Sequence, residues 1–593
     1  MCGIIGEIAL NRKNITTSKK NIASGLTTMA SRGPDYSAIK KTNKLIFGHS
    51  RLSIIDTSKN SNQPMKKDNF IIVFNGEIYN YKKLKQELIK LGASFKTSGD
   101  TEVIIESYRY WGDKCVSKFE GMWAFAIFNT KNNIGLISRD PIGQKPLVYT
   151  YKDNSIYFAS ELPALLKIIK KPNPNWHALS NFNLYNFRHI PAPYTAFQDV
   201  YKLKPGHNLT IDDKIKIKKY RSNAKISKKL SIEIDKAIDL VKVSDTKVGL
   251  MLSGGIDSSL IAERLRNLDT YSIGQSKQDP ELIRSKNVSN KLKLKNKSTI
   301  FDNSKNKSFL NHNNNIFCFG EPIYLEQIGY LKSILKQMNK DGIKVAIGGN
   351  GADEIFYGYN GARKLYWLSL LRNILIKKPL KFLISYIPFL NNIVSPAYEI
   401  KSKLYQSKID KKKYIKPEYR KFIYSDIFRD ISSEINSDNL IDIFNWLGLR
   451  IENEHSITIV GDLAGSMSSV EVRTPFLSNS IIKFAMSLPD YSKIGIFSNK
   501  NKKPLRKLVE DRLDKETANY PKMGFGHNIN RNQFIFKNYD QISKIILKNI
   551  DKIDIYESKI IRNMISSKKD FEANYQQIFE IYLVCKWFQN NYQ

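Results

Sequence analysis

The sequence contains little cysteine. Its 593 residues include four, Cys2, Cys115, Cys318 and Cys585, which lie far apart and form no CxxC pair. Zinc sites and disulfide frameworks need closely spaced or paired cysteines, so neither is expected. The N-terminus shows no basic segment followed by an apolar run, which argues against a secretory signal. These features predict a protein of the reducing cytoplasm.

Long apolar runs are also missing. The most apolar stretch, residues 363–398, is interrupted by Arg372, by Lys377-Lys378-Pro379 and by Lys381. No uninterrupted run reaches the roughly 20 apolar residues that span a bilayer. We therefore expect a helical insertion that packs on the rest of the protein. The alternative is an interfacial segment that touches a membrane surface, so membrane contact is not our expectation but stays open.

Acidic residues are few beside basic ones. There are 94 Lys and Arg against 56 Asp and Glu, which gives a net charge of +38. Such charge can attract nucleic acid or anionic membranes. The lysines are spread along the whole chain, however, and no zinc-finger or RNA-recognition motif accompanies them. We interpret the charge as a compositional bias and expect no nucleic-acid partner.

The length and the pattern of apolar segments indicate an α/β protein with several domains. A chain of 593 residues is too long for one hydrophobic core. The first part reads as β-rich with helices, whereas the second alternates strands and helices, which indicates a parallel sheet covered on both faces. Closely spaced prolines near 190–215, followed by a charged linker, suit a domain edge. We expect domains at 1–215 and 225–593, with a helical insertion at about 360–440.

The first residues, MCGIIGE, allow two interpretations of Cys2. The cysteine could be a small buried residue at the start of a strand. Alternatively, Met1 is removed and Cys2 then carries both a thiol and the free α-amine. An α-amine titrates near pH ~8, so it can take the thiol proton near neutral pH. Cys2 would then be a nucleophile that carries its own base.

The stretch VGLMLSGGIDSSL (248–260) indicates a phosphate-binding loop. An apolar strand runs into Ser253-Gly254-Gly255, and a helix starts at about Asp257-Ser258. Glycines let the backbone approach a ligand closely, and the N–H groups at a helix start favour an anion. The GxxxxGK[ST] spacing and its lysine are absent, so this is not a Walker A loop. SGGxDS instead resembles the pyrophosphate-binding loop of the ATP pyrophosphatases.

Two further stretches carry charged residues beside glycines or a helix start. VAIGGNGADEIFYGY (345–359) follows another strand and places Asp353 and Glu354 near the expected phosphate site. Carboxylates with phosphate oxygens recruit Mg²⁺, although acids at a helix start can also act only as caps. NKNKKPLRKLV (499–509) places lysines before a helix. Such a lysine can stabilise charge at an α-phosphate, or it can belong to a solvated basic face.

Several motifs, in order, resemble those of the glutamine-hydrolysing asparagine synthetase family, of the asparagine synthase B type. The N-terminal half resembles a class II (Ntn) glutamine amidotransferase, which implies an αββα sandwich. The C-terminal half resembles an ATP-pyrophosphatase synthetase domain, which implies a doubly wound parallel sheet. The motifs are MCGIIG (1–6), SRGPDYS (31–37), GHSRLSIID (48–56), FNGEIYN (74–80), SGDTE (98–102), EGMWAFAIFN (120–129), SRDPIGQKPL (138–147), LSGGIDSS (252–259), GGNGADEIFYGY (348–359), SSVEVRTPFLS (468–478) and KKPLRK (502–507).

The resemblance assigns glutamine hydrolysis to the N-terminal half. Cys2 matches the nucleophile, and Asn75 with the Gly76 N–H matches the oxyanion hole. Arg51 matches the residue that binds the glutamine α-carboxylate, and Glu77 and Asp100 match the acids that bind the α-ammonium. An internal passage for ammonia to the second site is implied. The residues expected to contact glutamine are Arg51, Leu52, Ser53, Ile54, Ile55, Asn75, Gly76, Glu77 and Asp100.

The resemblance assigns ATP-dependent amide formation to the C-terminal half. Asp257 and Asp353 match acids associated with Mg²⁺-pyrophosphate. Lys502 matches the family's KxxLR lysine, although its neighbour Lys503 leaves the register open. Expected products are an amide, AMP and pyrophosphate. The residues expected to bind ATP are Leu252, Ser253, Gly254, Gly255, Asp257, Ser258, Ile273, Gly348 and Gly349.

One departure affects the acceptor carboxylate. Asparagine synthetases read SGEGSDE where this chain reads GGNGADE, so Asn350 stands in place of an acid. An amide cannot take a proton from attacking ammonia as a carboxylate can. FGEPIYLEQIGYL (319–331) also lacks the Thr-Ile-Arg text of some aspartate-using members. We expect aspartate as the acceptor, with glutamine, ATP and Mg²⁺.

The alternatives differ from this expectation in the acceptor or in the class of protein. One is the same chemistry on another carboxylate, such as a sugar acid in surface polysaccharide synthesis. A β-lactam-forming relative would not need Cys2 or the glutamine-binding residues. A basic nucleic-acid or membrane-binding protein with a decayed catalytic core is disfavoured because Cys2, Arg51, Asn75, Ser253 and Asp257 are all present. The resemblance is also compatible with a homodimer.

Overall fold

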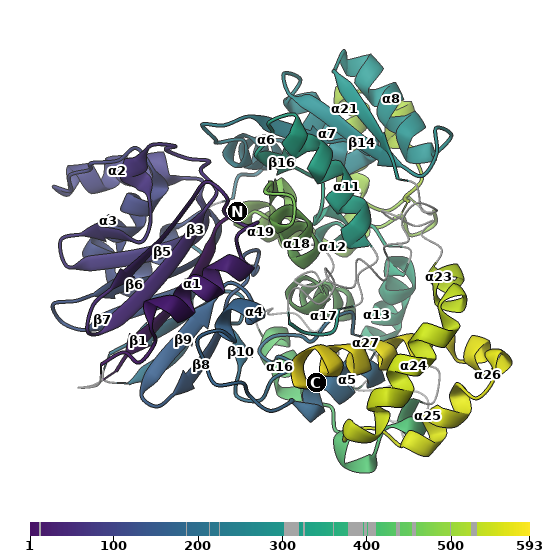
Figure 1. Cartoon of the computed structure of the whole chain (residues 1–593). Coiled ribbons are helices and arrows are strands. Elements are labelled where there is room, and N and C mark those ends of the chain that lie inside the picture. Colours follow the sequence, from purple (N-terminus) through teal and green to yellow (C-terminus); the bar gives the residue numbers. More distant parts are fainter. Residues whose placement is uncertain are drawn as a thin grey trace.

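The structure is a computed structural model that places each half of the chain around its own sheets (Figure 1). It describes residues 1–10, 14–185, 187–212, 214–224, 226–301, 320–323, 327–359, 361–376, 395, 400, 411–433, 439–452, 458–498, 500–523 and 531–593. Cys318, much of the apolar stretch 363–398 and part of 319–331 lie outside these residues.

Residues 1–219 form two stacked antiparallel sheets. Their strand orders are β10-β8-β9-β1-β3-β2 and β12-β11-β7-β6-β5-β4. The first sheet contains β1 Gly3–Ala9, β2 Tyr36–Lys41, β3 Leu45–Arg51, β8 Val148–Lys152, β9 Ser155–Ala159 and β10 Tyr201–Lys202. The second contains β4 Met65–Lys67, β5 Phe70–Ile78, β6 Gly121–Asn129, β7 Ile134–Arg139, β11 His207–Ile211 and β12 Ile215–Lys219.

Alternating side chains fix how these sheets stack. Ile4 and Val73 pack in the core between the sheets, whereas their neighbours Ile5 and Phe74 pack in other clusters on the opposite faces. The core with Ile5 includes residues of α1 Lys19–Thr28, and the core with Phe74 includes residues of α2 Tyr81–Lys90 and α3 Asp100–Trp111. The result is the αββα sandwich expected from the sequence.

The second half contains a five-stranded sheet in the order β15-β14-β13-β16-β17, and all four neighbouring pairs are parallel. The strands are β13 Val248–Met251, β14 Asp269–Gly274, β15 Asn296–Ile300, β16 Val345–Ile347 and β17 Glu471–Arg473. The strand order reverses between β13 and β16. In doubly wound sheets, ligands bind outside the carboxyl ends of the strands at such a switch point. The expected fold class is therefore confirmed for this half as well.

Helices cover both faces of this sheet. One face packs against α6 Leu230–Val241, α7 Ile256–Arg264, α8 Pro280–Leu292, α19 Asn479–Ser487 and α21 Lys503–Arg512. The other packs against α11 Gln327–Lys340 and α18 Ile459–Ser466. The shorter helices of this half are α12 Ala352–Ile355, α16 Ser425–Ser432, α17 Leu440–Leu447, α20 Asp490–Lys493 and α22 Lys515–Ala518.

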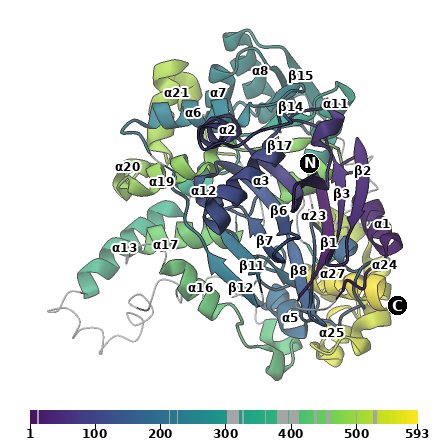
Figure 2. The same ribbon diagram turned by 90° about the vertical axis from the view of Figure 1, so that its left-hand side faces the viewer.

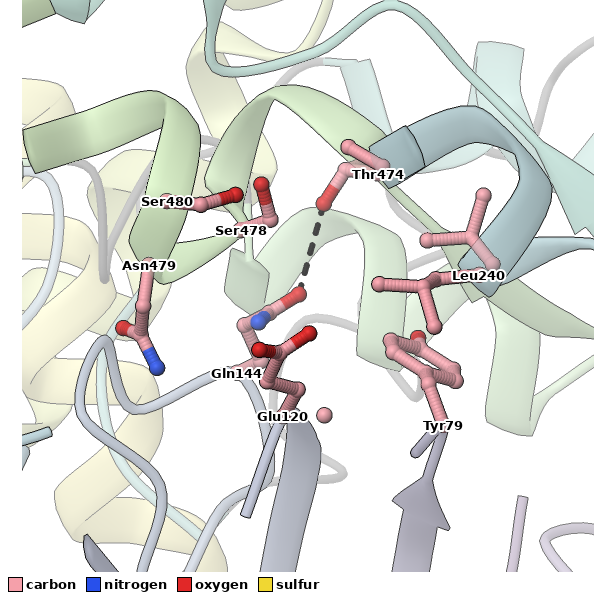
Figure 3. Close-up of a pocket in the computed structure, with 11 residues that line it drawn as sticks. Tyr79, Glu120, Gln144, Leu240, Thr474, Ser478, Asn479 and Ser480 are labelled. Atoms are coloured by element: carbon pink, nitrogen blue, oxygen red, sulfur yellow. Dashed lines mark hydrogen bonds between the residues drawn. The ribbon is translucent and has the colours of Figure 1, made fainter. Parts of the chain in front are cut away.

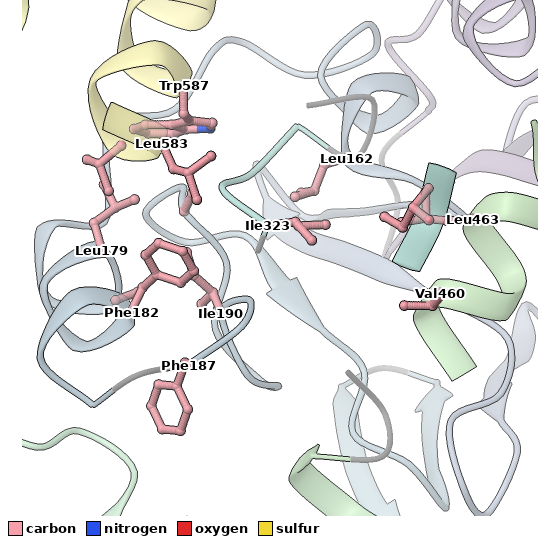
Figure 4. Close-up of a cluster of buried hydrophobic side chains, with 14 of the residues drawn as sticks. Leu162, Leu179, Phe182, Phe187, Ile190, Ile323, Val460, Leu463, Leu583 and Trp587 are labelled. Carbon is pink, nitrogen blue, oxygen red and sulfur yellow. The ribbon is translucent and has the colours of Figure 1, made fainter. Parts of the chain in front are cut away.

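The largest apolar core joins the two halves (Figure 4). Leu179 and Phe182 of α5 Trp176–Leu184 pack in the same cluster as Leu583 and Trp587 of α27 Tyr575–Tyr592. The other helices of the C-terminal region are α23 Arg531–Lys537, α24 Tyr539–Asn549, α25 Ser558–Met564 and α26 Lys568–Ala573. This core also contains Leu162 of α4 Leu162–Leu165 and Leu463 of α18. The halves therefore share buried apolar surface.

Helix α13 Ala362–Ile376 projects from the rest of the molecule in Figure 2. It contains the start of the apolar stretch singled out in the sequence. Within the described ranges, no helix has the length and apolar character needed to cross a membrane.

Candidate active sites

The start of β1 places Cys2 against the end of β5. The Cys2 backbone N–H donates to Asn75 Oδ1 at 3.1 Å, and Cys2 Sγ lies 3.8 Å from the Leu52 carbonyl oxygen. Gly76 has a φ of +143°, and a Cβ there would lie 2.0 Å from the Met122 carbonyl oxygen. Only glycine fits so close to the neighbouring strand. The structure thus places the expected nucleophile against Asn75, which directly precedes Gly76.

The surroundings of Cys2 set the charge of the thiol and the amine. Burial raises the pKa of the Cys2 thiol, and the nearby α-amino group acts in the opposite direction. Burial also lowers the pKa of the α-amino group of Met1 to about 6. An amine with this pKa is mostly neutral at pH 7 and can accept a proton. This amine belongs to Met1, and removal of Met1 would transfer the terminal amine to the Cys2 nitrogen, which lies 3.1 Å from Asn75 Oδ1.

The Arg51 guanidinium holds the loop that follows β3. One Nη atom donates to the Ser58 carbonyl at 2.9 Å and to Asn62 Oδ1 at 2.8 Å. The other donates to the carbonyls of Ile55 and Asp56. Arg51 therefore shapes the loop that contains Leu52, Ser53, Ile54 and Ile55. Its expected bond to the glutamine carboxylate stays a prediction, because these carbonyls already use both Nη atoms.

Two acids lie buried near the end of β5. Glu77 Oε1 lies 3.2 Å from an Arg473 Nη atom, and its Oε2 has no hydrogen-bond partner among the described residues. Asp100 Oδ2 accepts the Ile78 N–H at 3.0 Å. Burial raises the pKa of Asp100 to about 6 and raises that of Glu77 as well. Two buried acids that have lost their solvation favour a bound cation. The α-ammonium of glutamine, which the sequence predicts at this place, is such a cation.

The second site begins where β13 ends. Ser253 Oγ lies 3.1 Å from Ser258 Oγ, and the Gly255 N–H donates to Ser253 Oγ at 3.3 Å. Gly254 has a φ of +71°, and a Cβ there would lie 2.4 Å from the Arg284 backbone. Helix α7 then begins at Ile256, so its first N–H groups lie beside the loop. This is the strand–loop–helix geometry expected for a phosphate site.

A lysine joins this loop to the loop after β16. Lys502 Nζ lies 2.6 Å from Asp257 Oδ2 and 2.8 Å from Asp353 Oδ1. Burial opposes its charge, but the two carboxylates outweigh burial and raise the pKa of Lys502. Lys503 instead donates to the Tyr491 carbonyl at the surface, 3.4 Å away. Of the two lysines left open by the sequence, the structure places Lys502 in the acidic cluster.

The cavity at this site has a volume of about 80 Å³. Its lining includes Ser253, Gly255, Asp257 and Lys502, and also basic side chains that the sequence did not single out: Arg284, Arg506 and Lys522. Lys522 lies 2.7 Å from Asp353 Oδ2.

The residues expected to contact the nucleoside lie beside this cavity without lining it. Leu252 and Ile273 are buried at the carboxyl ends of β13 and β14. The Gly348 N–H donates to the Arg473 carbonyl at 2.9 Å, and Gly349 follows directly. Their contact with the nucleoside of ATP stays a prediction.

The acids of this site suit a metal that also binds phosphate. Asp257 Oδ1 is buried and has no hydrogen-bond partner among the described residues. The described part of the chain contains no cluster of three or more His, Cys, Asp or Glu residues that could hold a metal ion. Asp257 and Asp353 could therefore hold Mg²⁺ only together with other ligands, such as phosphate oxygens.

Comparison with known proteins decides the family. A family model described as a glutamine amidotransferase domain matches residues 1–221, and a model described as asparagine synthase matches residues 229–589. The chain belongs to the asparagine synthase family. It is 30% identical to asparagine synthetase [glutamine-hydrolyzing] 1 of Bacillus subtilis, over 100% of this chain and 97% of that protein.

A more distant relative agrees with this family assignment. Asparagine synthetase [glutamine-hydrolyzing] 3 of Bacillus subtilis is 26% identical, over 88% of this chain and 87% of its own length. A solved glutamine phosphoribosylpyrophosphate amidotransferase of B. subtilis covers 58% of this chain and 81% of its own, at 15% identity and a TM-score of 0.28. That similarity is too low to support any argument.

This member of the asparagine synthase family also contains buried ion pairs that join its halves. Arg32 Nε donates to the Cys2 carbonyl at 2.9 Å, and its Nη atoms bind Glu161 and, in bidentate fashion, Asp462 of α18. Lys145 Nζ lies 3.3 Å from a Glu471 oxygen. Sequence analysis missed these partners.

The signal for these pairs is indirect. Arg32 lies in the motif 31–37 and Arg473 in the motif 468–478, but Asp462 and Glu77, which they contact across the halves, are far away in the chain. Asp462, for example, is 430 residues from Arg32. No local pattern predicts a contact over such a separation.

A small cavity of about 20 Å³ lies between the halves beside these ion pairs (Figure 3). Tyr79, Glu120 and Gln144 line it from the first half, and Thr474 faces them from the second. The Thr474 hydroxyl donates to Gln144 Oε1 at 3.3 Å. The cavity has room for a water molecule but not for a substrate.

Proposed function

We propose that this enzyme converts L-aspartate to L-asparagine, with ammonia from glutamine hydrolysis and energy from ATP. The overall reaction is L-aspartate + L-glutamine + ATP + H2O → L-asparagine + L-glutamate + AMP + diphosphate. The observation that carries the proposal is the contact of Cys2 with Asn75 in the first half, together with the Asp257–Lys502–Asp353 cluster in the second. Family membership supports the same pair of reactions.

In the first reaction, the Cys2 sulfur attacks the side-chain amide carbon of glutamine. The terminal α-amine, exposed on Cys2 once Met1 is removed, takes the thiol proton and passes a proton to the departing ammonia. Asn75 and the Gly76 N–H would stabilise the negative oxygen of the tetrahedral intermediate. Water then hydrolyses the thioester and releases glutamate.

In the second reaction, the β-carboxylate of aspartate attacks the α-phosphorus of ATP, and pyrophosphate leaves. Lys502 and the N–H groups of the loop 253–258 would stabilise the charge that develops on the phosphate oxygens. Mg²⁺, held by Asp257 and Asp353 with phosphate oxygens, would neutralise the charge of the pyrophosphate. Ammonia then attacks the acyl carbon of the adenylate, so that asparagine forms and AMP leaves.

Direct product analysis tests this proposal. Purified protein with Mg-ATP, glutamine and aspartate should form AMP and asparagine in equal amounts, and neither should form when aspartate is omitted. Glutamate formation without aspartate-dependent AMP would overturn aspartate as the acceptor. A sugar acid would then be tested, because Asn350 replaces the acid at that position.

The Cys2→Ala variant tests the nucleophile. It should lose glutamine-dependent synthesis and keep synthesis from added ammonia, because only the first reaction needs the thiol. Cys115→Ala is the matched control, since Cys115 is buried in the core of the first half. Glutamine hydrolysis by Cys2→Ala would contradict the assignment.

A further inference from the structure

Arg473 connects four groups in the buried interface between the halves. Its Nε donates to Glu471 Oε1 at 2.9 Å, and one Nη donates to the carbonyls of Val241 and Val243 at 2.9 and 2.6 Å. The other Nη lies 3.2 Å from Glu77 Oε1. The side chain is 0% exposed. An arginine from the second half therefore contacts an acid of the expected glutamine site.

The charge of Glu77 depends on this contact. Burial raises the pKa of Glu77, and Asp100 and Glu471 raise it further. Arg473 lowers the pKa most strongly among the opposing groups, and Lys145 also lowers it. Without the guanidinium, Glu77 would more readily hold a proton. A protonated acid binds the ammonium group of an amino acid poorly.

The backbone of Arg473 reaches the other site. Ile347 of β16 pairs with Arg473 of β17, and the Arg473 carbonyl accepts the Gly348 N–H at 2.9 Å. Gly348 opens the loop that leads to Asp353, which pairs with Lys502. One residue thus contacts the nucleotide-site loop through its carbonyl and the glutamine site through its guanidinium.

We propose that Arg473 is a positioning residue that couples the two sites of this enzyme. It holds Glu77 in place and favours its charged form for the glutamine α-ammonium, and a shift of the Gly348 loop on nucleotide binding moves Arg473 and changes the affinity for glutamine. Because binding linkage is reciprocal, glutamine changes the affinity for the nucleotide by the same factor. This inference rests on the proposed function.

Titration of glutamine into the Cys2→Ala protein tests the coupling, because this variant binds glutamine without consuming it. The dissociation constant is measured with and without Mg²⁺ and a non-hydrolysable ATP analogue. We expect a change of at least threefold on addition of the nucleotide. In the double variant Cys2→Ala/Arg473→Lys, the ratio of the dissociation constants measured without and with the nucleotide should fall toward one. The coupling would be overturned if the ratio of the two dissociation constants were the same in Cys2→Ala and in the double variant. It would also be overturned if this ratio were one in Cys2→Ala.

Steady-state hydrolysis separates positioning from a general structural role. In the otherwise native chain, Arg473→Lys and Arg473→Met should raise KM for glutamine at least fivefold and leave kcat within about twofold. In Arg473→Met, the increase in KM for glutamine should become smaller as pH increases, because Glu77 loses its proton and regains its charge. An unchanged KM would overturn the proposal, and Arg473→Lys decides alone if Arg473→Met does not fold.

Two controls identify the cause of a negative result. Arg139→Lys alters another buried arginine, which donates to the carbonyls of Lys145, Leu203 and Gly143, and should leave KM for glutamine unchanged. AMP formation from added ammonia should persist in the Arg473 variants. A native protein that hydrolyses no glutamine would contradict the proposed function itself. If the native protein hydrolyses glutamine and the Arg473 variants have the same KM for glutamine as the native protein, only the coupling would be contradicted.

Discussion

Lys502 combines a left-handed backbone conformation with a buried side chain. Its φ of +58° is left-handed, and it caps α21 with its side chain turned toward two carboxylates. It is 4% exposed, whereas the next residue, Lys503, lies at the surface. A buried lysine held between two acids keeps its charge in a place where a free lysine would lose it.

Substitution of Lys502 should separate the two reactions. Lys502→Met should lower the rate of aspartate-dependent AMP formation by about 10²–10³, the usual cost of removing one charge-stabilising donor. Glutamine hydrolysis should persist. Lys503→Met is the control and should leave both rates near those of the native protein. Equal losses in the two variants would contradict the assignment to Lys502.

Asp100 predicts the pH dependence of glutamine use. Its pKa of about 6 is raised by burial, and only the ionised form attracts the α-ammonium of glutamine. As pH falls through 6, Asp100 gains a proton, so kcat/KM for glutamine should fall about tenfold per unit below that pH. Asp100→Asn should have a higher KM and lack this titration. A kcat/KM that stays constant from pH 7 to pH 5 would contradict the role of Asp100.

At the scale of the elements, the loop between β13 and α7 depends on one of its two glycines. Gly254 combines a positive φ with a backbone neighbour at 2.4 Å from the position of its missing Cβ. Gly255 has an ordinary φ of −77°, and a Cβ there would meet only the Ser253 hydroxyl at 3.4 Å. The two adjacent glycines therefore have different structural constraints.

A pair of alanine substitutions tests this difference. Gly254→Ala should lower the free energy of unfolding by about 1–3 kcal/mol, the cost of a strained backbone conformation, and raise KM for ATP. Gly255→Ala should leave the thermal midpoint nearly unchanged. Thermal unfolding of both variants measures the contrast, and equal midpoints would show that the Gly254 conformation is not required.

The sequence predicted the elements better than their long-range contacts. The apolar strand expected before Ser253 corresponds to β13, because a buried apolar run is a local signal. The sequence also placed Asp353 near the phosphate loop, and in the structure Lys502 joins Asp353 to Asp257 of that loop. Arg32, Arg473 and Lys522 were not given roles, since their partners come from distant segments.

At the scale of the whole molecule, the contact between the halves is both apolar and ionic. The shared core contains Phe182 and Trp587, and the ionic part contains Arg32 with Glu161 and Asp462. The side chains of these three charged residues are at most 9% exposed. Separation of the halves would expose the core and would break ion pairs formed away from water.

Loss of Asp462 should therefore destabilise the protein strongly. Asp462→Ala leaves the buried guanidinium of Arg32 with Glu161 alone, and breaking a buried pair in this way costs about 3–5 kcal/mol of unfolding free energy. Asp239→Ala breaks the exposed pair with Arg264 and should have little effect. Urea unfolding followed by tryptophan fluorescence measures both. Equal midpoints in urea for the two variants would contradict a structural role for the buried pair.

The bond from Arg32 to the Cys2 carbonyl has a consequence for recombination between relatives. The same guanidinium that holds the nucleophile is fixed by an aspartate of the other half. A hybrid gene that joins the first half of one relative to the second half of another must preserve both members of such pairs. Their compatibility, more than the choice of fusion point, would then decide whether the hybrid can hydrolyse glutamine.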